Sequence, residues 1–191
     1  VLNVGAFDCV SRKEYGNMII KNGGQLNLST GEVKVNDFTL EASLGGIKDA
    51  ERVSARSGSI TNAEQLIVNG NAYFDIALDA NGECTQGWYD FTVPFPVNAL
   101  TGVQRFENGE LRTNLKNEVN YAIMSYHEDV RAQGKYGWAK YRGIMQPGQC
   151  YTITIDDYHN VYRFVKTASG ALNASNTLQV TATARITEVT G

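Results

Sequence analysis

The sequence predicts an all-β protein, in which a short β-solenoid or meander packs on an antiparallel, β-sandwich-like unit. Three observations support this fold class. The chain has 19 glycines for turns, only 3 prolines, and 10 tyrosines together with many valines and threonines, which favour strands. Short runs of alternating apolar and polar residues recur along it, as in half-buried strands. Clusters of turn residues separate these runs.

Residues 1–80 contain the first group of alternating runs. Leu26 and Leu28 alternate with polar neighbours, and a similar run covers residues 33–40. A third run, residues 64–78, has apolar residues on both sides of Asn69-Gly70. This dipeptide predicts a β-hairpin, but it also suits the corner of a solenoid rung, and both alternatives stay open.

A weak repeat supports the idea of rungs in this region. The pattern Gln-Leu-x-[Leu/Val] occurs at residues 25–28 and again at 65–68, about forty residues later. Two copies suit a short solenoid as well as a meander, because a stacked core normally needs three repeats. We interpret residues 44–59 as strand and loop, since their Gly, Ser and Val content gives them low helix propensity.

The second half has longer and more aromatic strands. We expect strands at residues 88–93, 121–126, 150–156, 160–166 and 178–189, a further stretch at 102–114 with an Asn108-Gly109 turn, and one helical turn at 128–133. The change of character lies between Ala77 and Gly87. We therefore predict a strand-rung region, 1–80, and a sandwich-like domain, 81–191, an arrangement that also fits one continuous structural unit.

The stretch GWYDFTVPFPV begins this second half. Alternation predicts that Tyr89, Phe91 and Val93 face the core while Trp88 lies on the polar face. Pro94 and Pro96 cannot both lie within a central hydrogen-bonded strand. The strand should therefore leave its sheet there, with Phe95 at the end of the core.

Charge and composition exclude several function classes. The formal net charge is -3 and only 19% of the residues are charged, so there is no basic surface for nucleic acid. The chain contains no apolar stretch of membrane-spanning length and no visible signal peptide. Removal of a signal on export would leave the same pattern, so export stays open. We expect no cofactor.

The sequence indicates no catalytic residues and no metal ligands. With two histidines and no HExxH, GxSxG, P-loop or GxGxxG motif, the common catalytic signatures are missing. Cys150 is followed by a β-branched strand rather than a helix, so we interpret it as a structural cysteine. Cys84 and Cys150 can pair as a disulfide, whereas three cysteines are too few for a disulfide framework.

Aromatic residues provide the remaining candidates for a binding site. Flat rings match the apolar faces of pyranose sugars, and we select Trp88, Trp138 and Tyr141 as candidate ligand-binding residues. Packing inside a sandwich rich in Tyr and Phe is the alternative for all three, and cover by a neighbouring loop is the alternative for Trp88.

The second half also resembles a known β-rich module. The stretches WYDFTVPFPV (88–97), GW (137–138) and MQPGQCYTI (145–153) are similar to a module near the end of large secreted and surface proteins of gut Bacteroidetes. Residues 23–42 and 64–74 resemble the rungs that precede it there. The resemblance implies an exported, all-β protein, and it transfers no catalytic residues.

From these observations we expect a non-enzymatic structural or adhesion module, extracellular or on the cell surface, within a larger exported protein. Its partner would be a glycan or another surface protein. The alternative is a carbohydrate-binding module that uses the exposed aromatic residues. An enzyme with two carboxyl groups assembled in a cleft is a third possibility.

Overall fold

A computed structural model describes residues 2–4, 16–21, 24–28, 33–42, 59–61, 66–78, 87–157 and 160–167. In this part of the chain the protein is mostly β, with several sheets and one short helix. The predicted all-β class is therefore confirmed. The stretch at 178–189 lies outside the described residues, as do Cys9, Cys84 and almost all of residues 44–59.

The early strands form three parallel ladders. The first contains β1 (Leu2–Val4), β3 (Gln25–Leu28) and β6 (Ser59–Thr61); the second contains β4 (Val33–Val35) and β7 (Leu66–Val68); the third contains β2 (Met18–Ile20), β5 (Phe38–Leu40) and β8 (Ala72–Leu78). A meander pairs successive strands antiparallel, whereas these strands pair with strands that follow later in the chain. The described early strands are therefore not a meander.

The corners between these strands also stack on one another. Asn36 accepts a hydrogen bond from the backbone N–H of Gly70 (2.7 Å) and donates its own N–H to Gly16 (3.0 Å). The Asp37 carboxylate accepts the N–H of Asn71 at 2.8 Å. Asn69-Gly70 therefore forms a corner between β7 and β8, and the hairpin alternative is wrong because these two strands do not pair with each other.

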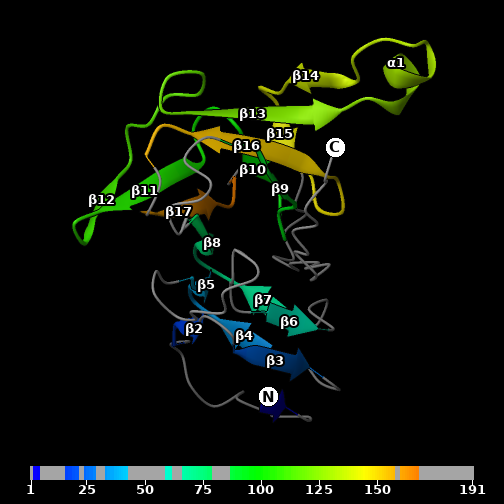
Figure 1. The fold of residues 1–191 in the computed structure, drawn as a ribbon. Coiled ribbons are helices and arrows are strands. Elements are labelled where there is room, and N and C mark those ends of the chain that lie inside the picture. Colours follow the sequence, from blue (N-terminus) through cyan, green and yellow to red (C-terminus); the bar gives the residue numbers. More distant parts are fainter. Residues whose placement is uncertain are drawn as a thin grey trace, which may run out of the picture.

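Strand β8 joins the ladders to the second half of the chain. It pairs in parallel with β5 on one side and antiparallel with β17 (Asn160–Val165) on the other. The sheet continues through β11 (Val103–Glu107) and β12 (Glu110–Arg112), which gives six strands in the order β12-β11-β17-β8-β5-β2. Figure 1 shows β8 and β17 between the early strands below and the four-stranded sheet that contains β13 (Tyr121–Tyr126) and β16 (Tyr151–Ile155) above.

The second Asn-Gly pair does form the predicted hairpin. Glu107 lies opposite Glu110 across β11 and β12, so Asn108 and Gly109 are the two turn residues. Their φ angles of 50° and 84° are both positive, as a type I′ turn requires.

A second, fully antiparallel sheet has four strands in the order β14-β13-β16-β9. They are β14 (Trp138–Lys140), β13 (Tyr121–Tyr126), β16 (Tyr151–Ile155) and β9 (Tyr89–Phe91). The single helix among the described residues, α1 (Glu128–Ala132), follows β13 at the predicted position. A small pair, β10 (Val97–Asn98) with β15 (Ile144–Met145), lies beside this sheet (Figure 1).

The two larger sheets share one core. Phe91 of β9 packs on Phe164 of β17, with ring centroids 5.1 Å apart, and Phe164 also contacts Phe74 of β8 at 6.0 Å. The same buried cluster extends to Leu66 and Val68 in the ladders. Both predicted regions thus contribute to one sheet and one core, while a division near residue 80 stays a prediction.

The GWYDFTVPFPV stretch has the predicted arrangement. Phe91 and Val93 are buried, Tyr89 packs against the core, and Trp88 is 50% exposed. Strand β9 ends at Phe91, before the two prolines, and Phe95 is fully buried in the core. The prolines therefore mark the exit of the chain from the four-stranded sheet.

Candidate functional site

The outer face of the four-stranded sheet contains both tryptophans. Its inner face packs on the core through residues such as Phe91 and Ile153. Alternation places Trp88, next to Tyr89 of β9, on the opposite face. Trp138 also points outward, because it lies directly opposite the exposed Tyr126 and contacts its ring.

Tyr126 and Trp138 form an aromatic pair at one end of this face. Their ring centroids are 5.2 Å apart, with an interplanar angle of 61°, which is an edge-to-face contact. Tyr126 is 44% exposed and Trp138 is half-buried. Gly137 permits this packing, because a Cβ atom there would lie 2.9 Å from the Tyr126 ring.

The two tryptophans lie on opposite edge strands of the sheet. Trp88 adjoins β9 and Trp138 begins β14, and β16 and β13 separate these strands. Three strand spacings amount to roughly 14 Å. A single sugar ring therefore cannot contact both tryptophans, whereas a chain of several sugars could.

Tyr141 lies on the other side of the sheet from Trp138. Its ring packs against the core residue Tyr151, with centroids 5.1 Å apart. Its hydroxyl donates a hydrogen bond to the carbonyl oxygen of Ile144 at 2.7 Å. The structure thus brings Trp88 and Trp138 to one face and places Tyr141 on the core side.

A charged cluster continues the outer face beyond Trp138. Lys140 lies two residues after Trp138 on β14, hence on the same face, and its Nζ is 2.8 Å from a carboxylate oxygen of Glu118. Arg142 contacts the other oxygen of Glu118 at 2.6 Å. Hydrogen bonds from Lys140 and Arg142 lower the pKa of the Glu118 carboxyl. One carboxylate therefore holds two cations.

Beside this face, the exposed His127 precedes α1. Its Nε2 lies 3.0 Å from the hydroxyl oxygen of Ser125, which is nearly buried. The backbone N–H of His127 donates to the carbonyl of Gly137 at 2.7 Å, and this bond closes the β13–β14 connection. The histidine thus helps to position the segment that carries Trp138.

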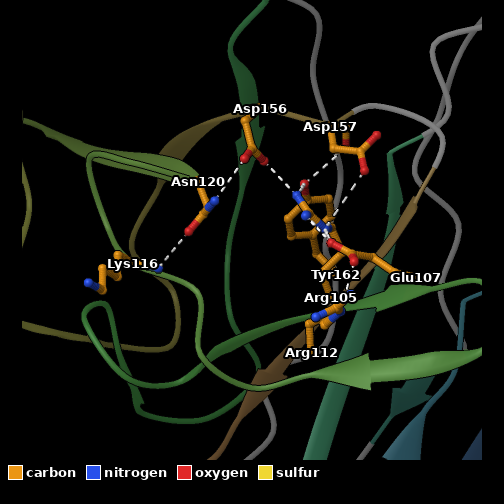
Figure 2. A network of polar contacts seen from close by, with 8 residues as sticks. All are labelled: Arg105, Glu107, Arg112, Lys116, Asn120, Asp156, Asp157 and Tyr162. Atoms are coloured by element: carbon orange, nitrogen blue, oxygen red, sulfur yellow. Dashed lines mark hydrogen bonds and ion pairs between the residues drawn. The ribbon is translucent and has the colours of Figure 1, made fainter.

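A second polar cluster surrounds the buried Arg105 (Figure 2). Its guanidinium donates to Asp156 at 2.6 Å and, through Nε, to Glu107 at 2.9 Å. It also reaches the hydroxyl of Tyr162 at 3.2 Å. Burial raises the pKa of this hydroxyl to about 12, whereas the hydrogen bond from Arg105 lowers the pKa of Glu107. A glycosidase acid needs a raised carboxyl pKa, so Glu107 lacks this property.

The third polar cluster joins β8 to β17. Arg163 forms a bidentate ion pair with the buried Asp75, with N–O distances of 2.8 and 2.9 Å. The guanidinium carbon lies 4.7 Å from the ring centroid of Tyr73 and 4.7 Å from that of Phe106. Desolvation raises the pKa of Asp75 despite this partner. The ion pair and both rings fix the register at the junction of the two regions.

Cys150 is exposed and has a free thiol in the structure. Its predicted partner, Cys84, lies outside the described residues, so a disulfide between them stays a prediction for the oxidised protein. Burial of the sulfur raises the pKa of the Cys150 thiol, and this disfavours the thiolate.

Comparisons with known proteins give no family: no protein-family model, no curated protein and no solved structure matches the chain. Within the described residues, no three acidic, histidine or cysteine side chains come together as metal ligands. In the same part of the chain, no helix has the length and apolar character needed to cross a membrane.

Sequence reasoning missed Tyr126, Lys140, Arg142 and Glu118. The alternation in residues 121–126 places Tyr126 on the outer face, and this signal could have identified it. Glu118 meets the two cations only through the β13–β14 pairing and a turn in which its φ is 67°. No local pattern reveals that contact.

Proposed function

We propose that this chain is a non-enzymatic structural or adhesion module of a larger exported protein, located outside the cell or on its surface. Two things support the proposal: the resemblance of residues 88–97, 137–138 and 145–153 to the surface-protein module, and the exposure of aromatic side chains on a sheet whose other face is a packed core. Such a sheet presents a rigid contact surface rather than a mobile loop.

We also propose the finer architecture, a short solenoid-like stack joined to a sandwich-like unit. The in-register parallel ladders and the stacked Asn36 and Gly70 corners support the first part. The packing of Phe91 on Phe164 between two sheets supports the second. A stack of this kind transmits load along its length and suits a structural role.

The Tyr126–Trp138 pair is the observation on which the adhesion proposal mainly depends. Large apolar rings that stay exposed beside a packed core cost solvation free energy, and patches of this kind often mark contact surfaces. The buried Arg105 and the partly buried Arg163 are both neutralised by carboxylates, which supports a stabilising role for these charges rather than a catalytic one.

Carbohydrate binding is the second candidate function. It is favoured by Trp138, which is supported edge-on by Tyr126 and has Trp88 across the same face. Tyr141 would not contact the glycan itself. Its ring packs behind β14 on Tyr151, so it would support the binding face from the core side. A glycan chain along the outer face would stack on the tryptophans.

A glycan array with the wild type and the Trp138→Ala, Trp88→Ala and Tyr126→Ala variants tests this candidate. We expect binding that Trp138→Ala abolishes and Tyr126→Ala weakens. Tyr136→Ala removes an aromatic ring that is 75% exposed but outside the sheet, and it serves as the matched control. Failure of the wild type to bind any glycan would exclude carbohydrate binding.

The adhesion proposal has a separate test. Antibody labelling of intact source cells, before and after protease treatment, reports whether the chain is exposed on the surface. Beads coated with the wild type should adhere to a surface that carries the glycan or protein partner more strongly than beads coated with the Trp88→Ala/Trp138→Ala variant. Equal adhesion by both proteins, or labelling only in lysed cells, would contradict the proposal.

A further inference from the structure

We propose that the strip formed by Trp138, Lys140 and Arg142 binds an anionic polysaccharide, that is, a glycan whose sugars carry carboxylate groups. The inference rests on the carbohydrate-binding candidate and names the class of glycan. It depends on how the edge strand β14 and the residues that follow it bring an aromatic ring and two cations close together.

The spacing along β14 suits a linear ligand. Side chains two residues apart on a strand share a face and lie roughly 7 Å from each other. Trp138 and Lys140 have this relation, and Arg142, just beyond the end of β14, lies near Lys140 because both side chains contact the carboxylate of Glu118. A sugar ring stacked on Trp138 therefore brings the carboxylate of the next sugar toward Lys140.

The charges on the strip are positive overall. Glu118 carries one negative charge against the two positive charges of Lys140 and Arg142, which leaves one unneutralised. Both cations are largely exposed, at 66% and 64% of their side-chain surface. An ammonium group has three N–H donors and a guanidinium group five, so donors remain for a ligand. This local positive charge stands out in a chain with a net charge of -3.

Glu118 also holds the two cations in place before a ligand arrives. The carboxylate contacts Lys140 Nζ at 2.8 Å and the Nε of Arg142 at 2.7 Å. A preorganised cation loses less side-chain entropy on binding. Within the four described strands of this sheet, the register also places Asp90 on this face, on the opposite edge strand and roughly 14 Å away.

Binding of polygalacturonic acid, measured by isothermal titration calorimetry, tests the inference, with its fully methyl-esterified form as the neutral comparison. The wild type should bind the acid and bind the ester much more weakly. Lys140→Gln/Arg142→Gln should lower the affinity at least about tenfold, because each substitution removes a charge-assisted hydrogen bond.

Lys21→Gln/Arg112→Gln removes the same two kinds of cation from exposed positions elsewhere and should leave binding unchanged. Equal binding of acid and ester would overturn the anionic specificity while leaving carbohydrate binding intact. If the protein binds neither polymer but binds neutral glycans on the array, the anionic specificity is likewise overturned and carbohydrate binding stands. Equal losses in both double variants, or equal binding of single-stranded DNA, would show that only general charge attraction operates.

Discussion

Arg163 is a charged residue whose removal should destabilise the fold. It neutralises Asp75, which is only 1% exposed, and its guanidinium lies between the rings of Tyr73 and Phe106. Replacing it would leave a buried carboxylate without its partner. The pair thus connects β8 to β17 through both charge and ring contacts.

We expect Arg163→Ala to lower the free energy of unfolding by about 3 kcal/mol at pH 7. Urea titrations would measure this loss. Without Arg163 the pKa of Asp75 rises further above its unfolded-state value of 3.8, so the loss should shrink as the pH falls toward 3.8 and should be smallest where the carboxyl is protonated in both states. Arg112→Ala, which breaks the exposed pair with Glu107, is the control. Equal losses in the two variants would contradict a special role for Arg163.

Tyr121 should make the free energy of unfolding depend on pH in the alkaline range. Its hydroxyl is buried and donates to the carbonyl of Ala99 at 2.8 Å, and desolvation raises its pKa from 10.0 to about 12. Above pH 10 the unfolded chain releases this proton while the folded protein keeps it. Stability should therefore be constant below pH 10 and fall between pH 10 and 12.

For one such tyrosine the expected loss between pH 8 and pH 11 is roughly 1 kcal/mol. Tyr121→Phe loses the hydrogen bond at every pH but has no proton to release, so its stability should decline less over this range. Urea midpoints at pH 8, 10 and 11 measure both slopes. Parallel declines in the wild type and the variant would rule out Tyr121 as a source of the effect.

At the scale of elements, the corner at Gly70 is a sterically sensitive position in the parallel ladders. A Cβ atom there would lie 2.9 Å from the carbonyl oxygen of Asn36 and closer still to the Asp37 carboxylate. Because one of these contacts is with backbone, the corner cannot yield without breaking the stacking of β7 on β4.

We expect Gly70→Ala to destabilise the protein by about 1–3 kcal/mol, as overpacking does. Gly16→Ala is a matched control, since Gly16 begins the corresponding corner before β2 and has nothing within 4 Å of an added Cβ. Thermal unfolding of both variants measures the difference. A control that is as unstable as Gly70→Ala would indicate a general intolerance of alanine at corners instead.

The sequence predicted most of the elements but not how they pair. Alternation located β3, β13 and β16, because one face of each strand is buried. The two Asn-Gly pairs look alike locally, yet Asn108-Gly109 is a hairpin and Asn69-Gly70 is a corner. The two pairs differ because β7, the strand before Asn69-Gly70, pairs with β4 of the neighbouring rung and not with β8. Local propensity carries no information about such a partner.

The same limit applies to the candidate site. Alternation correctly predicted that Trp88 faces away from the core, because it depends only on neighbours within one strand. That Trp138 faces outward and Tyr141 faces the core depends on the register of β14 with β13, which is a tertiary feature. Glu118 joined the site through a turn with a positive φ, a conformation that a glutamate rarely adopts.

At the scale of the whole molecule, β8 determines whether the chain can be divided. It lies inside the six-stranded sheet, pairs with β17 over six residue positions, and contributes Phe74 and Ile76 to the common core. Without it, β17 would have an unpaired edge and Phe164 would lose one of its aromatic neighbours. The second half should therefore depend on the first.

We accordingly expect the full chain to unfold in a single cooperative transition, seen with coincident fluorescence and circular dichroism curves. The fragment 81–191, which omits β8, should lack a cooperative transition and should aggregate through the exposed edge of β17. Adding residues 66–80 back, as the fragment 66–191, restores β8 and should recover part of the cooperativity. Cooperative unfolding of 81–191 with a midpoint near that of the full chain would instead establish it as an independent domain. A sheet that loses an interior strand keeps its stability only if the remaining strands close the core on their own.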